Sequence, residues 1–243
     1  MPRIILKPSQ PVKTIRRVIP QINSVVKNND FIEFNEYLKG SVRHRLRKQP
    51  PKGYFSLDYY GWGKPNNPDF INTLKNDFNC NSSADLASSC KQLRKVIDSA
   101  IANLITRENI TTICVVPRSK VRDFYSGEQL LFLSCIKESV EEAQYYGVEI
   151  EDGTDYILRY TNTKTTHFHN KPEYSGDGDY PYVGITNATC HISPNVRDKR
   201  ILLIDDIYTK TINIDEDCMQ ALFANGAREV VLYTVARTVY KGA

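Results

Sequence analysis

The residues with the clearest chemical potential lie in the sequence ILLIDDIYTKTINIDEDC, positions 201–218. Four aliphatic residues, typical of a buried strand, lead into the adjacent aspartates Asp205 and Asp206. A polar stretch follows and leads into a predicted helix, with Asn213 as the expected N-cap and Glu216 as its capping-box partner. Such a strand–loop–helix junction binds anions through hydroxyls and exposed backbone N–H groups. Carboxylates beside it suit a ligand with both phosphate and hydroxyl groups, such as a sugar diphosphate with a divalent ion. The alternative is that the acidic pair is helix-start charge that favours the macrodipole.

The elements that would position these residues are predicted from residue 81 onward. Apolar residues at helical spacing predict a helix that begins near Asn81, Ser82 or Ser83, and further helices at 128–146 and 214–225. Short apolar runs predict strands at 111–116, 182–186, 188–192, 201–205 and 229–235. This alternation argues for an α/β fold, a mostly parallel sheet flanked by helices. In such sheets ligands bind beyond the carboxyl ends of the strands.

The first 80 residues differ from the rest, so we expect a division into an N-terminal extension or hood, 1–80, and an α/β domain, 81–243. The extension is rich in Pro, Asn, Tyr and basic residues, and apart from a short predicted helix at 22–39 it reads as irregular. Residues 1–53 contain 12 Lys or Arg and 3 Asp or Glu, which is +9, whereas the remaining residues sum to −5. A basic segment on an acidic body indicates an anionic partner.

A basic cluster within this extension is followed at once by aromatic residues at 54–62. The cluster contains Arg43, Arg45, Arg47 and Lys48. Basic residues beside aromatics suit phosphate contacts and base stacking, so residues 40–62 are a candidate surface for a nucleic acid or a protein partner. The alternative is a solvated basic face followed by an aromatic patch that packs on the sheet.

Composition and cysteine usage narrow the class of protein. The 243 residues are 41% hydrophobic and 25% charged, which excludes disorder, collagen-like repeats and long coiled coils as descriptions of the whole chain. No apolar run reaches the ~20 residues of a membrane span, and the N-terminus lacks the features of a signal peptide. Six scattered cysteines without CxxC spacing read as reduced thiols, so we expect a cytoplasmic protein without a membrane partner. An oligomer is compatible with this sequence.

The segment ILLIDDIYTKTIN resembles the phosphoribosyl pyrophosphate (PRPP) signature of type I phosphoribosyltransferases, in which hydrophobic residues precede two acidic residues and a Thr/Gly-rich loop. The following NIDEDCMQALFANGAREVVLYTVART is similar to the next helix, Gly-Ala turn and strand of that family. The DDIYT core and the VART ending look closest to the ComF-like and amidophosphoribosyltransferase-like branch. The resemblance spans roughly residues 85–240 and is specific over 201–238. It implies a Rossmann-like core and a PRPP-dependent glycosyltransferase of nucleotide metabolism.

The resemblance also implies roles for individual residues. Asp205 and Asp206 would bind the ribose 2- and 3-hydroxyls, and Mg²⁺ would be carried by PRPP rather than held in a protein cage. The 5-phosphate would lie on a loop that contains Thr209, Lys210, Thr211 and Asn213. The pyrophosphate would face the segment after the 111–116 strand, which contains Arg118, Ser119 and Lys120. Taken alone, Arg118 and Lys120 are ordinary solvated loop charges.

The phosphate loop departs from the family pattern at two positions. Thr211 replaces a glycine and Asn213 replaces the final threonine, while Lys210 offers a compensating cation. Thr209 lies where purine-salvage members carry an aspartate base, which argues against hypoxanthine or guanine salvage. The leading hypothesis is therefore a phosphoribosyltransferase that displaces pyrophosphate at C1 with an unknown acceptor. The alternative is a catalytically degenerate member of the fold that binds a nucleotide or nucleic acid as a regulatory or effector subunit. A third, less favoured, is an unrelated metal-dependent enzyme or hydrolase.

Residues 160–181 read as a loop, a place where a lid could lie near Arg159 and Lys164. Two histidines in it, His167 and His169, could join Cys190 and His191 around zinc, but this spacing matches no established site. Solvated loop histidines are the simpler interpretation.

Overall fold

The computed structural model describes residues 32–33, 52–165, 184–210 and 212–239. Its main sheet has the strand order β1-β2-β8-β7-β3-β4, and every neighbouring pair is parallel except β1 with β2. The strands are β1 (Ile32–Glu33), β2 (Lys52–Tyr59), β3 (Thr112–Val115), β4 (Glu151–Asp152), β7 (Arg200–Tyr208) and β8 (Glu229–Thr238). A separate antiparallel pair consists of β5 (Ile157–Arg159) and β6 (Cys190–Ile192). The expected α/β fold with a mostly parallel sheet is confirmed.

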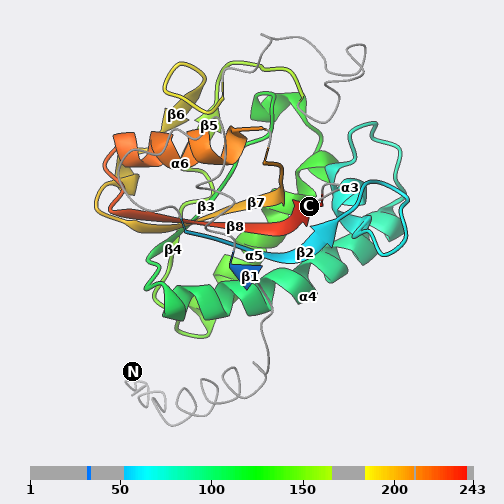
Figure 1. The fold of residues 1–243 in the computed structure, drawn as a ribbon, viewed down its shortest axis with the longest axis horizontal. Helices are drawn as coiled ribbons and strands as arrows, with labels where there is room; N and C mark the ends of the chain where they lie inside the picture. Colours follow the sequence, from blue (N-terminus) through cyan, green and yellow to red (C-terminus); the bar gives the residue numbers. More distant parts are fainter. Residues whose placement is uncertain (1–31, 34–51, 166–183, 211, 240–243) are drawn as a thin grey trace, which may run out of the picture.

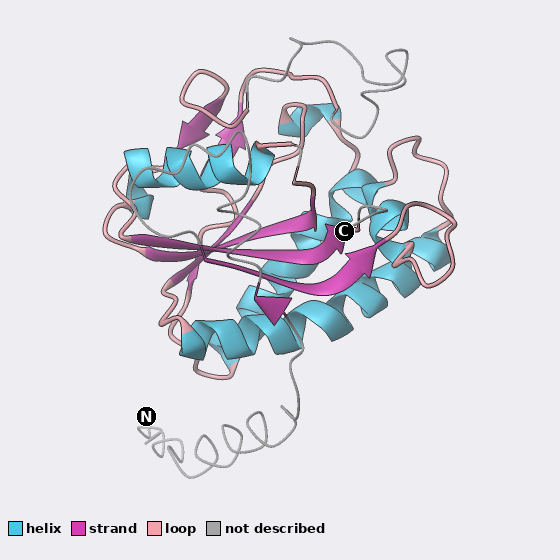
Figure 2. Cartoon of the chain, viewed as in Figure 1, coloured by secondary structure: helices cyan, strands magenta, loops and turns pink. Residues whose placement is uncertain are grey.

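Helices cover both faces of the sheet (Figures 1 and 2). The α-helices are α3 (Phe70–Lys75), α4 (Ser83–Arg107), α5 (Leu131–Tyr145) and α6 (Ile214–Ala224). Short 3₁₀ segments are η1 (Arg122–Phe124), η2 (Gly127–Leu130) and η5 (Pro194–Val196). One apolar core joins α3, α4 and α5 to one face of the sheet, and a second joins α6, β5 and β6 to the other.

Alternation along β7 assigns its side chains to these two cores. Leu202 and Ile204 lie in the core beneath α4 and α5, whereas Ile201 and Leu203 lie in the core beneath α6. All four are fully buried, as expected for a central strand of a parallel sheet. The same alternation decides where the side chains after Ile204 point.

The predicted elements that had clear periodicity are confirmed. Helix α4 begins after Ser82, whose hydroxyl accepts a hydrogen bond from the Asp85 N–H at 3.1 Å. Helices α5 and α6 and strands β3, β7 and β8 also lie where the sequence predicts them, although β7 and β8 are each three residues longer at their carboxyl ends.

Three expectations from the sequence are wrong. Ile32–Glu33, within the predicted 22–39 helix, form a strand paired with Phe55 and Tyr54, and the other residues of that range lie outside the described structure. Lys52–Tyr59, expected to be irregular, form a strand paired along its length with β8. The described part of the predicted 182–186 strand has no strand structure, and the 188–192 strand is reduced to β6. Within the described ranges, no helix combines the length and apolar composition needed to cross a bilayer.

Candidate functional site

A crevice is expected where β3 and β7 diverge at their carboxyl ends. Strand β3 ends at Val115, which pairs with Ile204, while β7 continues for four more residues beside β8. The chain leaves β3 for α5 on one face of the sheet and leaves β7 for α6 on the other (Figure 1). Ligands bind at such switch points of open α/β sheets. Asp205 and Asp206 are the first residues of β7 beyond the end of β3, and therefore lie at this point.

The two aspartates point to opposite faces of the sheet. Asp206 has the alternation phase of Ile204 and meets α3, where its Oδ2 is 2.9 Å from the Nζ of Lys75. Asp205 has the phase of Leu203 and meets α6, where its carboxyl group hydrogen-bonds that of Asp215. The sequence predicted that both bind one ribose, but each is already engaged by a different layer.

Lys75 is held in place by the turn that follows α3. It is 7% exposed, and its backbone carbonyl accepts a hydrogen bond from Nη1 of Arg118 at 2.7 Å. The next residue, Asn76, adopts a left-handed conformation (φ 45°), and its side-chain oxygen accepts hydrogen bonds from the N–H groups of Cys80 and Asn81. The ammonium group beside Asp206 is therefore part of a well-anchored loop.

The acidic groups on the α6 side have strongly perturbed protonation. Burial, and then the nearby carboxylate of Asp206, raise the pKa of Asp205 to about 7, against the hydrogen bond from Asp215. Burial, and then the charge of Asp205, raise the pKa of Asp215 well above its usual value. Oδ1 of Asp215 has no hydrogen-bond partner among the described residues. Near neutral pH the pair thus holds at least one proton.

Helix α6 does not start with the capping box that the sequence predicted. Asn213 occupies the N-cap position, but its side chain makes no capping hydrogen bond. Glu216 is fully buried and instead accepts a hydrogen bond from the hydroxyl of Tyr208 at 2.8 Å. Burial raises the pKa of Glu216 to about 7. The prediction is wrong because the buried strand residue Tyr208 competes for the glutamate, a tertiary contact that local sequence does not encode.

The predicted phosphate loop is only partly described. The hydroxyls of Thr209 and Thr238 are 3.0 Å apart, and the N–H of Ile212 donates to the carbonyl of Thr209 at 2.9 Å. These contacts make a tight turn after β7, with Lys210 partly exposed in it. Thr211 lies outside the described residues, so the replacement of the family's glycine has no structural account here.

The predicted pyrophosphate segment directly follows the carboxyl end of β3. The guanidinium group of Arg118 stacks 4.2 Å from the ring centre of Tyr125 and pairs with Asp77. Its Nη1 donates to the carbonyl oxygens of Lys75 and, at 2.6 Å, of Gln129. Arg118 is thus a structural clamp between α3 and η2.

Ser119 and Lys120 join this segment to the loop after β5. The Ser119 hydroxyl is 3.0 Å from that of Thr165, and its carbonyl accepts from the N–H of Thr163. Lys120 is 6% exposed, and its Nζ donates to the Thr163 carbonyl at 2.7 Å. The structure therefore brings Arg118, Ser119 and Lys120 to the switch point, but ties them mainly to the protein itself.

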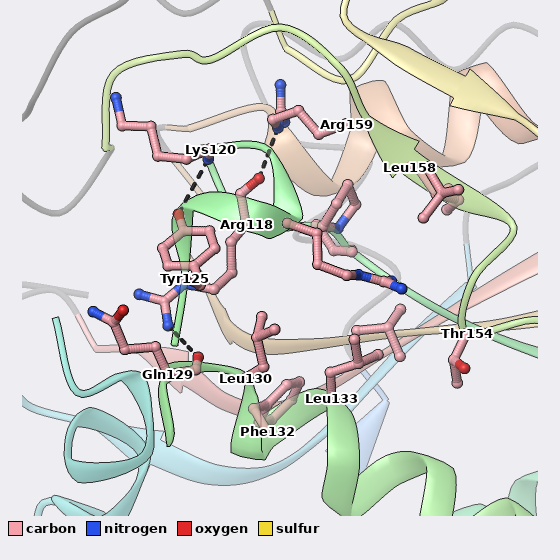
Figure 3. Close-up of a pocket in the computed structure, with 15 residues that line it drawn as sticks. Arg118, Lys120, Tyr125, Gln129, Leu130, Phe132, Leu133, Thr154, Leu158 and Arg159 are labelled. Atoms are coloured by element: carbon pink, nitrogen blue, oxygen red, sulfur yellow. Dashed lines mark hydrogen bonds between the residues drawn. The ribbon is translucent and has the colours of Figure 1, made fainter. Parts of the chain in front are cut away.

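A small cavity of about 80 Å³ lies beside this segment (Figure 3). Its wall is largely apolar, with Leu130, Phe132 and Leu133 below the Arg118 segment in that view. Lys120 and Arg159 extend on the other side of that segment (Figure 3). The sequence placed Arg159 only near a possible lid and did not predict that it is buried in β5 beside this cavity. The available signal was its alternation in β5, where Ile157 and Arg159 are buried and Leu158 is exposed.

Other sequence candidates fall elsewhere. The basic residues Arg43, Arg45, Arg47 and Lys48 lie outside the described structure, as do His167 and His169. Cys190 is buried in β6, while His191 is exposed on the opposite face of that strand. In the part of the chain that the structure describes, no group of three His, Cys, Asp or Glu side chains is arranged to hold a metal ion.

Comparisons with known proteins do not identify a family. No model of a known protein family matches the chain, and no curated protein matches its sequence.

Proposed function

We propose that the chain binds a phosphorylated ribose, such as PRPP, at the crevice between β3 and β7. In this proposal it is a phosphoribosyltransferase with a type I-like core, in which a nucleophile displaces pyrophosphate at the sugar C1. The observation that carries the proposal is the placement of Asp205 and Asp206 one step beyond the end of β3, at the switch point of the sheet. The turn after β7 and the start of α6 supply the neighbouring site for a phosphate.

The reaction requires positioning and charge stabilisation more than a strong base. Asp206 would accept a hydrogen bond from one ribose hydroxyl while Lys75 fixes its orientation. Asp205 would accept from the second hydroxyl in its ionised form, which competes with its proton at neutral pH because its pKa is about 7. Carboxylate oxygens at this edge fit Mg²⁺ bound mainly through the ligand, since Mg²⁺ in such sites keeps few protein contacts. When bound, Mg²⁺ would neutralise the leaving diphosphate.

The proposal is tested by comparing ribose 5-phosphate with 2-deoxyribose 5-phosphate in a calorimetric titration. Both sugars carry the same phosphate, so their difference isolates the contact of an acidic side chain with the 2-hydroxyl. We expect about tenfold weaker binding of the deoxy sugar, because a hydrogen bond to a charged group contributes roughly 1.5–3 kcal/mol. Equal affinities for the two sugars would remove the basis for a ribose site at Asp205 and Asp206.

A second function, a catalytically degenerate binding subunit, is favoured by one specific observation. Asp205, Asp206 and Arg118 are all engaged by groups of the chain itself, namely Asp215, Lys75 and Asp77. Such a subunit would act through a partner, and the basic residues at 43–48 are its candidate contact. For duplex nucleic acid the affinity should fall by roughly 0.9 log units per log unit of salt for each phosphate contact. Substituting Arg43, Arg45 and Arg47 by Ala should abolish that binding and leave sugar phosphate binding unchanged.

A further inference from the structure

Arg159 holds a buried positive charge that the described part of the chain does not neutralise. The residue is 8% exposed, and its Nε donates to the Arg118 carbonyl at 2.7 Å. Its Nη1 is buried without a hydrogen-bond partner, and no carboxylate of the described residues is paired with it. The guanidinium group of an arginine stays charged inside proteins, so the charge of Arg159 calls for an opposite charge beside it.

An uncompensated buried charge is costly. The effective penalty for burying one ion is several kcal/mol, and it is offset only when an opposite charge and hydrogen bonds are supplied. Among the described residues, the side-chain hydrogen bond of Arg159 to the Arg118 carbonyl uses a single N–H and does not require a guanidinium group. An anionic ligand that binds beside Arg159 would supply the missing opposite charge.

A second buried cation lies on the same side of the Arg118 segment. Lys120 extends there in Figure 3, and its Nζ donates to the Thr163 carbonyl. The backbone of Ser119 is bonded to Thr163 as well, so the two cations are presented by one connected unit of the β3 and β5 loops. Two cations on one rigid unit attract a group with more than one negative charge.

We propose that Arg159, assisted by Lys120, is the binding residue for an oxyanion of the phosphate class at the β3 side of the crevice. The fork of Arg159 would meet two oxygens of the anion, a geometry that phosphate groups favour. This inference depends on the proposed function only for the source of the anion: the diphosphate of a ribose donor, or free inorganic diphosphate.

The test is titration of the full chain with inorganic pyrophosphate, for the wild type and for Arg159→Gln. In glutamine, Nε2 occupies the position of arginine Nε, so the bond to the Arg118 carbonyl is kept while the charge is removed. We expect pyrophosphate affinity to fall about tenfold or more. We also expect the free variant to unfold at the same or a higher temperature than the wild type, since a buried unpaired charge is lost. A purely structural arginine would not show this combination.

The matched control is Arg122→Gln. Arg122 lines the same cavity and pairs with Asp155, so its loss changes the local charge equally but leaves Arg159 intact. This control should bind pyrophosphate within a few-fold of the wild type. If Arg159→Gln is poorly folded, Arg159→Lys keeps the charge but loses the two-point contact, and it should bind pyrophosphate clearly more weakly than the wild type.

Two results would overturn the proposal. One is absence of pyrophosphate binding to the wild type, and the other is unchanged affinity in Arg159→Gln. Its failure is distinguishable from failure of the proposed function. If pyrophosphate binding depends on Arg159 but neither ribose sugar binds, the anion site stands and the ribose site falls. If the protein binds ribose 5-phosphate more tightly than its deoxy analogue, but its affinity for pyrophosphate is unchanged in Arg159→Gln, the ribose site stands and the anion site falls.

Discussion

Asp205 and Asp206 are neighbours in sequence but have different chemical environments. Asp206 faces an ammonium group, whereas Asp205 is hydrogen-bonded to Asp215, and burial raises the pKa of both carboxyl groups. The difference follows from the alternation of side chains along a strand, which sends successive residues to opposite faces. The sequence therefore contained the signal for this separation, because Asp205 and Asp206 are consecutive residues at the carboxyl end of a predicted strand.

The ion pair of Lys75 and Asp206 should be measurable as a coupling energy. We expect Lys75→Met to lower the free energy of unfolding by about 1–3 kcal/mol, because it leaves a partly buried carboxylate without its cation. In the background of Asp206→Asn the same substitution should cost clearly less. Urea unfolding of the four proteins in this cycle gives the coupling, and strictly additive effects would show that the pair contributes nothing.

Glu216 should make the protein less stable as the pH rises. Its pKa is raised from 4.5 to about 7, so its contribution to stability is complete below pH 4.5 and is lost as the pH rises through 7. Between pH 5 and 8, the wild type should lose on the order of 1–3 kcal/mol of its free energy of unfolding through Glu216. We expect Glu216→Gln, which can still accept the hydrogen bond from Tyr208, to remove this loss. The raised pKa values of Asp205 and Asp215 act in the same direction.

Chemical unfolding at several pH values tests this prediction, with Glu141→Gln on the exposed face of α5 as a control. The control should keep the pH dependence of the wild type. A pH profile of Glu216→Gln that parallels the wild type would contradict the assigned protonation.

The turn between α3 and α4 is fastened to the segment that follows β3. Arg118 fastens it through the Lys75 carbonyl and Asp77, while Gln129 donates from its side chain to the Asn76 carbonyl at 3.1 Å. Local sequence could not predict these contacts, because they join residues 41 to 53 positions apart. Helix α4, in contrast, was predictable from its own periodicity and its Ser82 cap.

Arg118→Lys should loosen this element. A lysine cannot reach both carbonyls and Asp77 together, so we expect a loss of about 2–4 kcal/mol in the free energy of unfolding. The matched variant Arg122→Lys changes a partly exposed pair with Asp155 and should cost about 0.5 kcal/mol or less. Equal costs for the two variants in urea unfolding would refute the clamp.

At the scale of the whole molecule, the sheet from β8 to β3 was predictable, and strand β2 on the other side of β8 was not. Strands β7 and β8 are recognisable in the sequence as aliphatic runs, which are typical of buried parallel strands. Strand β2 reads KGYFSLDY, and its polar groups are satisfied by remote partners: Tyr54 and Lys52 bond Glu108, and Lys52 also bonds Glu229. Arg159 is similar, because only the fold shows that its charge is buried without a counterion among the described residues.

The proposed function requires a ribose phosphate to bind at the switch point between β3 and β7. The most direct test is a calorimetric titration of the full chain with PRPP and Mg²⁺, for the wild type and for the double variant Asp205→Asn, Asp206→Asn. We predict binding by the wild type and a loss of at least about tenfold in affinity in the double variant, while its circular dichroism spectrum stays unchanged. No binding to the folded wild type, or equal binding by the double variant, would contradict the account.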